Sequence, residues 1–107
     1  MQILLNEKEQ QLFDDCVRLN GLNNQIEQYL EECLEGALAA RKYFRAVKHG
    51  TASEVSQRLL ELESEIADTT IMSAQLRQVM HTEGIDNEIT RKLARQQVRI
   101  DNKKHND

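Results

Sequence analysis

The sequence of 107 residues contains no proline and no tryptophan, and its aromatic side chains are two tyrosines and two phenylalanines. So few aromatic and β-branched residues argue against a sheet-rich fold, because those residues pack best on a pleated surface. With 39% hydrophobic residues, the chain is too apolar for simple disorder. Its length allows one hydrophobic core. The composition therefore predicts a single all-α domain over residues 1–107.

Long hydrophobic runs are also absent. No stretch approaches the roughly 18 apolar residues of a membrane span. The opening MQILLNEKEQ lacks the basic and apolar regions of a signal peptide. We therefore expect a cytoplasmic protein with no membrane partner.

The chain has few residues that bind soft metals. Cys16 and Cys33 have neither a disulfide framework nor a metal-ligand spacing, and they predict reduced core thiols. His49, His81 and His105 share no metal-ligand spacing with each other or with the cysteines. We assign these histidines no chemistry.

Charge is unevenly distributed along the chain. The formal net charge is -4, but residues 91–107 hold six Lys or Arg against two Asp, so the rest of the chain is strongly acidic. A basic tail is compatible with nucleic-acid binding, yet no aromatic side chains alternate with these cations to stack on bases. The pattern therefore disfavours a nucleic acid as the partner.

Helix signals divide the chain into four segments. Asn6 with Glu9, and Thr51 with Glu54, are capping-box patterns. Gly21 and the glycines at 50 and 84 mark helix ends, and apolar residues recur at helical spacing between them. The predicted helices cover residues 7–19, 23–48, 52–82 and a last segment capped by Asp86, with a frayed tail at 102–107.

Only about four residues separate the second and third predicted helices, which favours an antiparallel hairpin with flanking N- and C-terminal helices. A hairpin alone cannot bury both of its faces. The flanking helices cover part of the apolar stripe, and a second copy of the chain covers the rest in a four-helix-bundle homodimer or homotetramer. Met72, Leu76 and Met80 belong to the core or to this interface.

Two acidic groups stand out, EECLE at 31–35 and EIAD at 65–68. Each group alone is typical of a solvated helix face. In a hairpin that turns at Gly50, however, the numbers of facing residues add up to about 100. This register pairs Glu35 with Glu65 and Glu32 with Asp68, about 22 Å from the turn.

Carboxylates brought together in this way repel one another, so their pKa values rise unless a cation neutralises them. A cluster of oxygen ligands without histidine or thiolate suits a hard ion, Mg²⁺ or Mn²⁺. Mg²⁺ held by a few carboxylates also accepts phosphate oxygens. The pattern therefore predicts a phosphorylated substrate.

The same motifs resemble the signature of the all-α nucleoside triphosphate pyrophosphohydrolases, the MazG-like superfamily, in which E-E-x-x-E is followed across a helical hairpin by E-x-x-D. EECLE and EIAD match it without substitution. The likeness extends over about residues 13–99, and the closing segment GIDNEITRKLARQQVRI is similar to that of small, often phage-encoded members. Two features depart from the family pattern: Gly36 replaces the usual Leu, and 29 residues separate Glu35 from Glu65.

The resemblance implies a Mg²⁺-dependent enzyme that cleaves a nucleoside triphosphate to its monophosphate and pyrophosphate. It makes Glu32, Glu35, Glu65 and Asp68 the main metal ligands. Glu31 is either a ligand of an additional ion or the base that orients the attacking water. The expected catalytic residues are thus Glu31 and Glu35, and the expected metal ligands are all five carboxylates.

Substrate contacts are expected from basic and amide side chains. Arg91, Lys92 and Arg95 are the preferred phosphate contacts, from the same or a partner chain, because the family's last helix carries a Lys and Arg pair there. Asn24 and Gln25 are expected to hydrogen-bond a base or sugar; the alternative is that Asn23 or Asn24 caps the start of a helix. The alternative phosphate contacts are Arg41, Lys42 and Arg45.

A different class of function competes with this hypothesis. A non-enzymatic dimeric helical adaptor, whose acidic hairpin is merely solvated, fits the same helical pattern. Such a protein would not respond to divalent ions, whereas a metal-binding cluster would raise the melting temperature when the ion is added.

Overall fold

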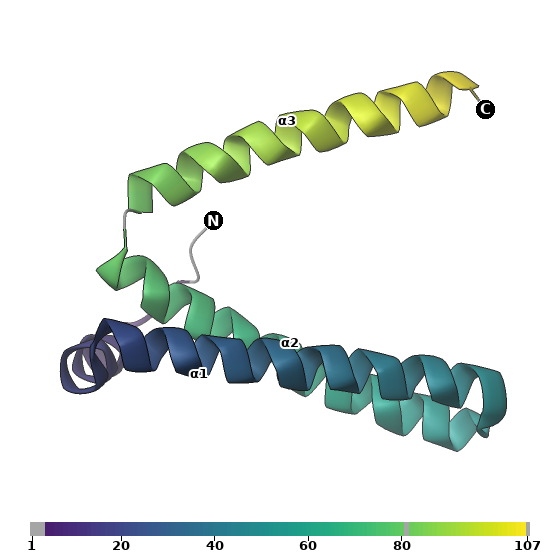
Figure 1. Ribbon diagram of the computed structural model, residues 1–107, viewed down its shortest axis with the longest axis horizontal. Coiled ribbons are helices and arrows are strands. Elements are labelled where there is room, and N and C mark those ends of the chain that lie inside the picture. Colours follow the sequence, from purple (N-terminus) through teal and green to yellow (C-terminus); the bar gives the residue numbers. More distant parts are fainter. Residues whose placement is uncertain (1–3, 81, 107) are drawn as a thin grey trace.

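The computed structural model describes residues 4–80 and 82–106 of the chain. It contains three helices, α1 (Glu7–His49), α2 (Ala52–Val79) and α3 (Thr82–Asn106), and this part of the chain has no β-strand (Figure 1). The predicted all-α class is therefore confirmed.

Local capping signals in the sequence fix where α1 and α2 begin. The amide of Glu9 donates to Asn6 Oδ1 at 2.8 Å, and the amide of Asn6 donates to Glu9 Oε1 at 3.0 Å, which completes the predicted capping box. Thr51 caps α2 by accepting a hydrogen bond from the amide of Glu54 at 3.1 Å. Both starts agree with the sequence prediction.

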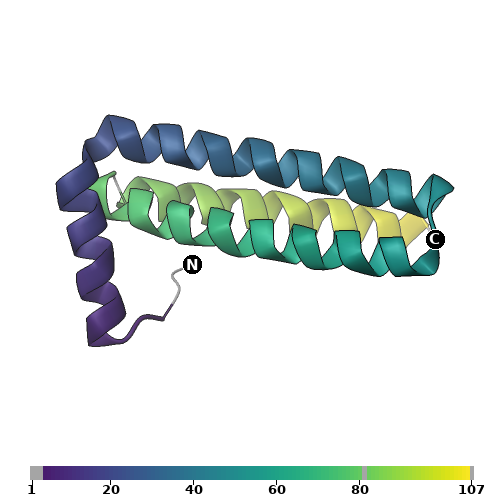
Figure 2. The ribbon, with the colours of Figure 1, turned by 90° about the horizontal axis from the view of Figure 1, so that it is seen from below.

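Gly21 divides α1 into two helical segments. Two separate helices were expected over 7–19 and 23–48, and the break between them is confirmed, because the φ of 77° and ψ of 166° at Gly21 are non-helical. This backbone conformation is essentially restricted to glycine, because a side chain would clash. Figure 2 shows the result: the first segment of α1 runs across the end of the long hairpin.

The second segment of α1 and the whole of α2 lie side by side and antiparallel, as expected (Figures 1 and 2). Small side chains allow the arms to approach closely near the turn, where Ala39 and Ala46 are buried. At the other end Met72 and Leu76 are buried. α2 ends at Val79, three residues earlier than predicted, because Met80 adopts an extended backbone.

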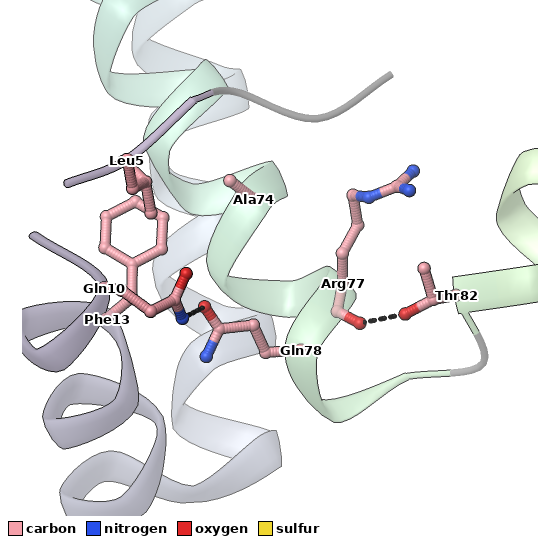
Figure 3. A pocket seen from close by; sticks show the side chains of 7 residues that line it. All are labelled: Leu5, Gln10, Phe13, Ala74, Arg77, Gln78 and Thr82. Carbon is pink, nitrogen blue, oxygen red and sulfur yellow. Dashed lines mark hydrogen bonds between the residues drawn. The ribbon is translucent and has the colours of Figure 1, made fainter. Parts of the chain in front are cut away.

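The first segment of α1 packs on the C-terminal part of α2 and leaves a recess of about 160 Å³ beside the buried Phe13 (Figure 3). Gln10 Nε2 donates to Gln78 Oε1 at 3.0 Å across this contact. Thr82 Oγ1 donates to the carbonyl of Arg77 at 2.6 Å and so ties the start of α3 to the end of α2.

The last helix differs from the prediction at both ends. α3 starts at Thr82, and Asp86 is not its cap: Asp86 accepts a hydrogen bond from Arg77 Nη2 at 2.6 Å. The helix continues through Asn106, where a frayed tail was expected, and basic residues in its last turn favour this end of the helix dipole. Asp107 lies outside the described residues.

α3 covers almost none of the hairpin surface. It contacts the rest of the described chain only through α2, and none of its described residues is buried (Figure 1). The expectation that the last helix covers part of the hairpin stripe is therefore wrong within one chain, because α3 runs along the arms without packing on them (Figures 1 and 2).

Burial in the described ranges is sparse. The buried apolar side chains there are Phe13, Ala39, Ala46, Met72 and Leu76. Cys16 and Cys33 are free thiols, as expected, but they are half-buried and do not lie in a closed core. Met80 is 48% exposed, so of the predicted methionine and leucine stripe only Met72 and Leu76 are core residues. No helix in these ranges is long and apolar enough to span a membrane.

Candidate metal centre

The hairpin brings together carboxylates from both acidic motifs. Glu32 of α1 and Glu65 and Asp68 of α2 each offer an oxygen atom, and these three oxygens lie within 4.8 Å of one another. The register of the hairpin produces this convergence, since Glu32 and Asp68 face each other as the sequence predicted. Oxygens at this spacing can bind the same cation. We call this group the carboxylate cluster.

Two members of the carboxylate cluster are partly removed from water. Glu32 and Glu65 are half-buried, while Asp68 is exposed. The Oε2 atoms of Glu32 and Glu65 are buried, and neither has a hydrogen-bond partner among the described residues. A buried polar atom without a partner costs free energy, so both oxygens are suited to accept a ligand.

The electrostatics of the carboxylate cluster follow from this burial. Loss of solvent raises the pKa of Glu32, and the charges of Glu35, Asp68 and Glu65 raise it further. Loss of solvent also raises the pKa of Glu65, with additional contributions from the charges of Glu35 and Asp68 and from a hydrogen bond with Glu35. The cluster thus holds more negative charge than the protein itself neutralises.

The remaining predicted acidic residues lie at the edge of the carboxylate cluster. Glu35 is exposed, and its carboxyl interacts with Glu65. Glu31 is also exposed, and its charge is the weakest of the neighbouring influences on Glu32. Their roles as ligand or base stay predictions.

The basic side chains of α3 do not reach the carboxylate cluster of their own chain. Arg91 instead pairs with Glu88 on the same helix, with Arg91 Nη2 2.7 Å from Glu88 Oε2. α3 makes no contact with α1 in this structure. The role of Arg91, Lys92 and Arg95 as phosphate contacts, from the same or a partner chain, stays a prediction.

Lys42 and Arg58 share a recess with two of the predicted acidic site residues. With Glu35, Glu61 and Glu65 they line a recess of about 250 Å³ between the arms. Arg58 Nη1 lies 2.9 Å from Glu61 Oε2, and this hydrogen bond holds the pKa of Glu61 below its usual range. Arg58 was missed in the sequence, although the pairing rule of the hairpin places it opposite Lys42.

Asn24 and Gln25 stabilise the bend in α1. Asn24 Nδ2 donates to the carbonyl of Asn20 at 2.9 Å, and Gln25 Nε2 donates to the carbonyl of Cys16 at 3.1 Å. Gln25 is only 2% exposed. Both amides thus join the two segments of α1, and contact with a base or sugar stays a prediction.

A scan against models of known protein families finds no match, and comparisons with curated proteins and with solved structures find no similar protein. The resemblance to pyrophosphohydrolases therefore depends on the two acidic motifs and on their convergence.

Proposed function

We propose that the carboxylate cluster binds Mg²⁺ or Mn²⁺ and that the protein is a nucleoside triphosphate pyrophosphohydrolase. The observation that carries this proposal is the convergence of Glu32, Glu65 and Asp68, with two buried oxygens that lack a partner. The raised pKa values of Glu32 and Glu65 support it, because a divalent cation relieves the unfavourable charge. A solvated acidic face would leave no such oxygens.

The reaction is hydrolysis at the bond between the α and β phosphates. Water adds to phosphorus, the bridging P–O bond breaks, and a nucleoside monophosphate, pyrophosphate and a proton are released. A bound divalent cation supplies Lewis acidity and neutralises phosphate charge. In this proposal Glu32, Glu65 and Asp68 hold the cation, and Glu35 or Glu31 accepts the proton of the attacking water.

Lys42 and Arg58 complete the proposed site. Both line the recess that adjoins Glu35 and Glu65. A guanidinium and an ammonium group there would bind phosphate oxygens that the cation leaves unpaired. They replace the cations of α3 as the phosphate contacts supplied by the same chain.

The test is a panel of NTPs and dNTPs incubated with the protein and Mg²⁺. Formation of monophosphate and pyrophosphate, abolished in Glu32→Gln, supports the proposal. Glu63→Gln is the matched control, since Glu63 is exposed on α2 outside the carboxylate cluster. If no nucleotide is hydrolysed, or if diphosphate and phosphate are formed, the proposed reaction is wrong.

A helical adaptor is the second candidate function, and the exposed apolar surface favours it. Leu30, Leu34 and Leu38 on α1 are all more than half exposed. An adaptor would bind another protein through this face and would show no thermal stabilisation by divalent cations. A homodimer or homotetramer, which we also propose, would cover the same residues.

A further inference from the structure

The isolated chain exposes more surface than a compact protein of its mass. Its accessible surface is 8551 Å², whereas a folded monomer of 12.4 kDa exposes about 6,100 Å². The radius of gyration is 17.6 Å, against about 13 Å for a compact domain of this length. The excess of about 2,400 Å² per chain, or about 4,800 Å² for two chains, lies within the range of roughly 2,000–5,000 Å² that obligate interfaces bury in total.

On the hairpin, exposed apolar side chains form a row along one side of α1. At 100° per residue they fall within a sector of about 100°. The row consists of Leu22, Ile26, Leu30, Phe44 and Val47, each between 42% and 62% exposed.

Neighbouring apolar side chains on α2 extend this surface. Leu62 and Ile66 line a recess of about 340 Å³ that reaches Gly36 of α1. Ile66 is 57% exposed. The described part of the chain has no element that covers this face.

α3 carries a matching apolar stripe. At 100° per residue, Ile85, Ile89, Leu93 and Ile100 fall on one side of the helix. Leu93 is 54% exposed and Ile100 is 48% exposed. A free-standing helix with such a stripe needs a second surface to pack against.

The charges of the two surfaces are opposite. Residues 20–40 and 59–76 of the hairpin contain eight Asp or Glu and no Lys or Arg. Residues 89–106 of α3 contain six Lys or Arg and one acidic residue. On α3, Lys92, Arg99 and Lys103 follow one edge of the apolar stripe.

The two surfaces also match in length. The acidic stretch of α1 spans about 30 Å, and residues 89–106 of α3 span about 27 Å. The apolar stripe of α3, with its basic edge, can therefore pack along nearly the full length of the apolar row of the hairpin, which has acidic neighbours. Each chain carries both surfaces, so the α3 of one copy can pack on the hairpin of a second copy.

We propose that α3 of each copy docks on the hairpin of a second copy, so that two chains exchange their last helices in a reciprocal dimer. The exchange covers the apolar row and neutralises the acidic hairpin with the partner's cations. It does not depend on the proposed hydrolysis, since the apolar and charge match alone carries it.

The experiment uses two charge-reversed variants of the full chain. One carries Lys92→Glu and Arg99→Glu on α3, and the other carries Glu27→Lys and Glu63→Lys on the hairpin. Sedimentation velocity gives the association state of each variant alone and of a 1:1 mixture, and circular dichroism confirms that each is helical. Arg45→Glu with Lys48→Glu, near the turn, is a control for the α3 change because it alters the net charge equally.

We expect a dimer for the wild type and the control at micromolar concentration. Each reversed variant alone should dissociate at least about 10-fold more readily, because like charges then face each other. The mixture should restore a heterodimer, since each α3 again meets a hairpin of opposite charge. If the wild type is a dimer of dimers, each reversed variant should likewise dissociate more readily, and the mixture should likewise reassociate.

Three outcomes would overturn the proposal. The first is a monomeric wild type, and the second is unchanged association of the α3 variant. The third is two variants that dissociate but do not combine, which would mean that α3 closes on its own chain or on another protein. If reversal unfolds the chain, Lys92→Gln with Arg99→Gln replaces it, and unchanged association would again contradict the exchange.

Discussion

The side-chain amide of Gln25 donates to the main-chain carbonyl of Cys16 at 3.1 Å and so joins the two segments of α1 across Gly21. Gln25 is almost completely buried, so this hydrogen bond is protected from water. The bond fixes the bend, and the bend in turn places Phe13 against the end of α2.

Replacing Gly21 with alanine should destabilise the protein by about 1–3 kcal/mol. The φ of 77° and ψ of 166° at this position are strained for any residue with a Cβ atom. Thermal denaturation measures the effect. An unchanged melting temperature would mean that α1 does not bend at Gly21.

Gly36→Ala is the matched control for this substitution. Gly36 is inside a regular part of α1, and an added Cβ would meet its nearest neighbours, Thr69 Oγ1 and Glu65 Cβ, at 3.9 and 4.0 Å. These are ordinary contacts. We expect stabilisation of up to about 1 kcal/mol, because alanine favours the helix.

Mg²⁺ or Mn²⁺ should raise the melting temperature of the wild type. A free ion concentration of 100 times Kd adds about 2.7 kcal/mol to the free energy of unfolding. Glu32→Gln should lose most of this gain and should be more stable than the wild type in EDTA, because one repelling charge is removed. Equal gains in both proteins would exclude the carboxylate cluster as the binding site.

Glu35→Gln and Asp68→Asn should each lower hydrolysis by about 100-fold or more while the helical circular dichroism signal is retained. Loss even of an outer-shell partner commonly costs 10- to 100-fold at metal sites, so loss of a direct ligand or base should cost at least as much. Steady-state kinetics with the preferred nucleotide measure this effect. Full activity in either variant would contradict the assigned role of that residue.

Lys42 and Arg58 should matter for substrate binding. Lys42→Ala is expected to raise KM about 10-fold, because it removes a cation from the recess beside Glu35 and Glu65. Lys103→Ala is the control, since Lys103 is exposed in the last turn of α3. A normal KM for Lys42→Ala would mean that the phosphate contacts lie elsewhere.

The triple variant Arg91→Ala, Lys92→Ala, Arg95→Ala separates the two sources of phosphate contacts. These side chains do not reach the carboxylate cluster of their own chain. If they act from a partner, kcat/KM should fall with dilution of the wild type into its monomer range, and the triple variant should lose that dependence. If the triple variant has the kcat/KM of the wild type at every protein concentration, α3 has no role in phosphate binding.

The contact between Asp86 and Arg77 should produce a pH-dependent contribution to stability. The hydrogen bond from Arg77 holds the pKa of Asp86 below its usual value of 3.8. A carboxyl with a lowered folded-state pKa contributes stability above its unfolded pKa and loses it as the pH falls through the folded pKa. The melting temperatures of the wild type and Asp86→Asn should therefore differ at neutral pH and converge in acid.

The sequence alone determined the helical class, the capped starts of α1 and α2 and the pairing of the acidic motifs. These features depend on local signals, such as the capping box at Asn6, and on the register that a tight turn at Gly50 imposes. The break at Gly21 was also predicted, but periodicity could not show the angle at which the two segments of α1 meet.

Only the tertiary structure decided where α3 goes and which cations lie near the carboxylate cluster. Nothing local in the sequence fixes the direction of a helix after the short connection at Met80, so residue spacing could not show that α3 makes no contact with α1. The partial burial of Glu32 and Glu65 likewise depends on how closely the arms pack. Side-chain packing across the hairpin sets that distance, and residue spacing along one helix does not encode it.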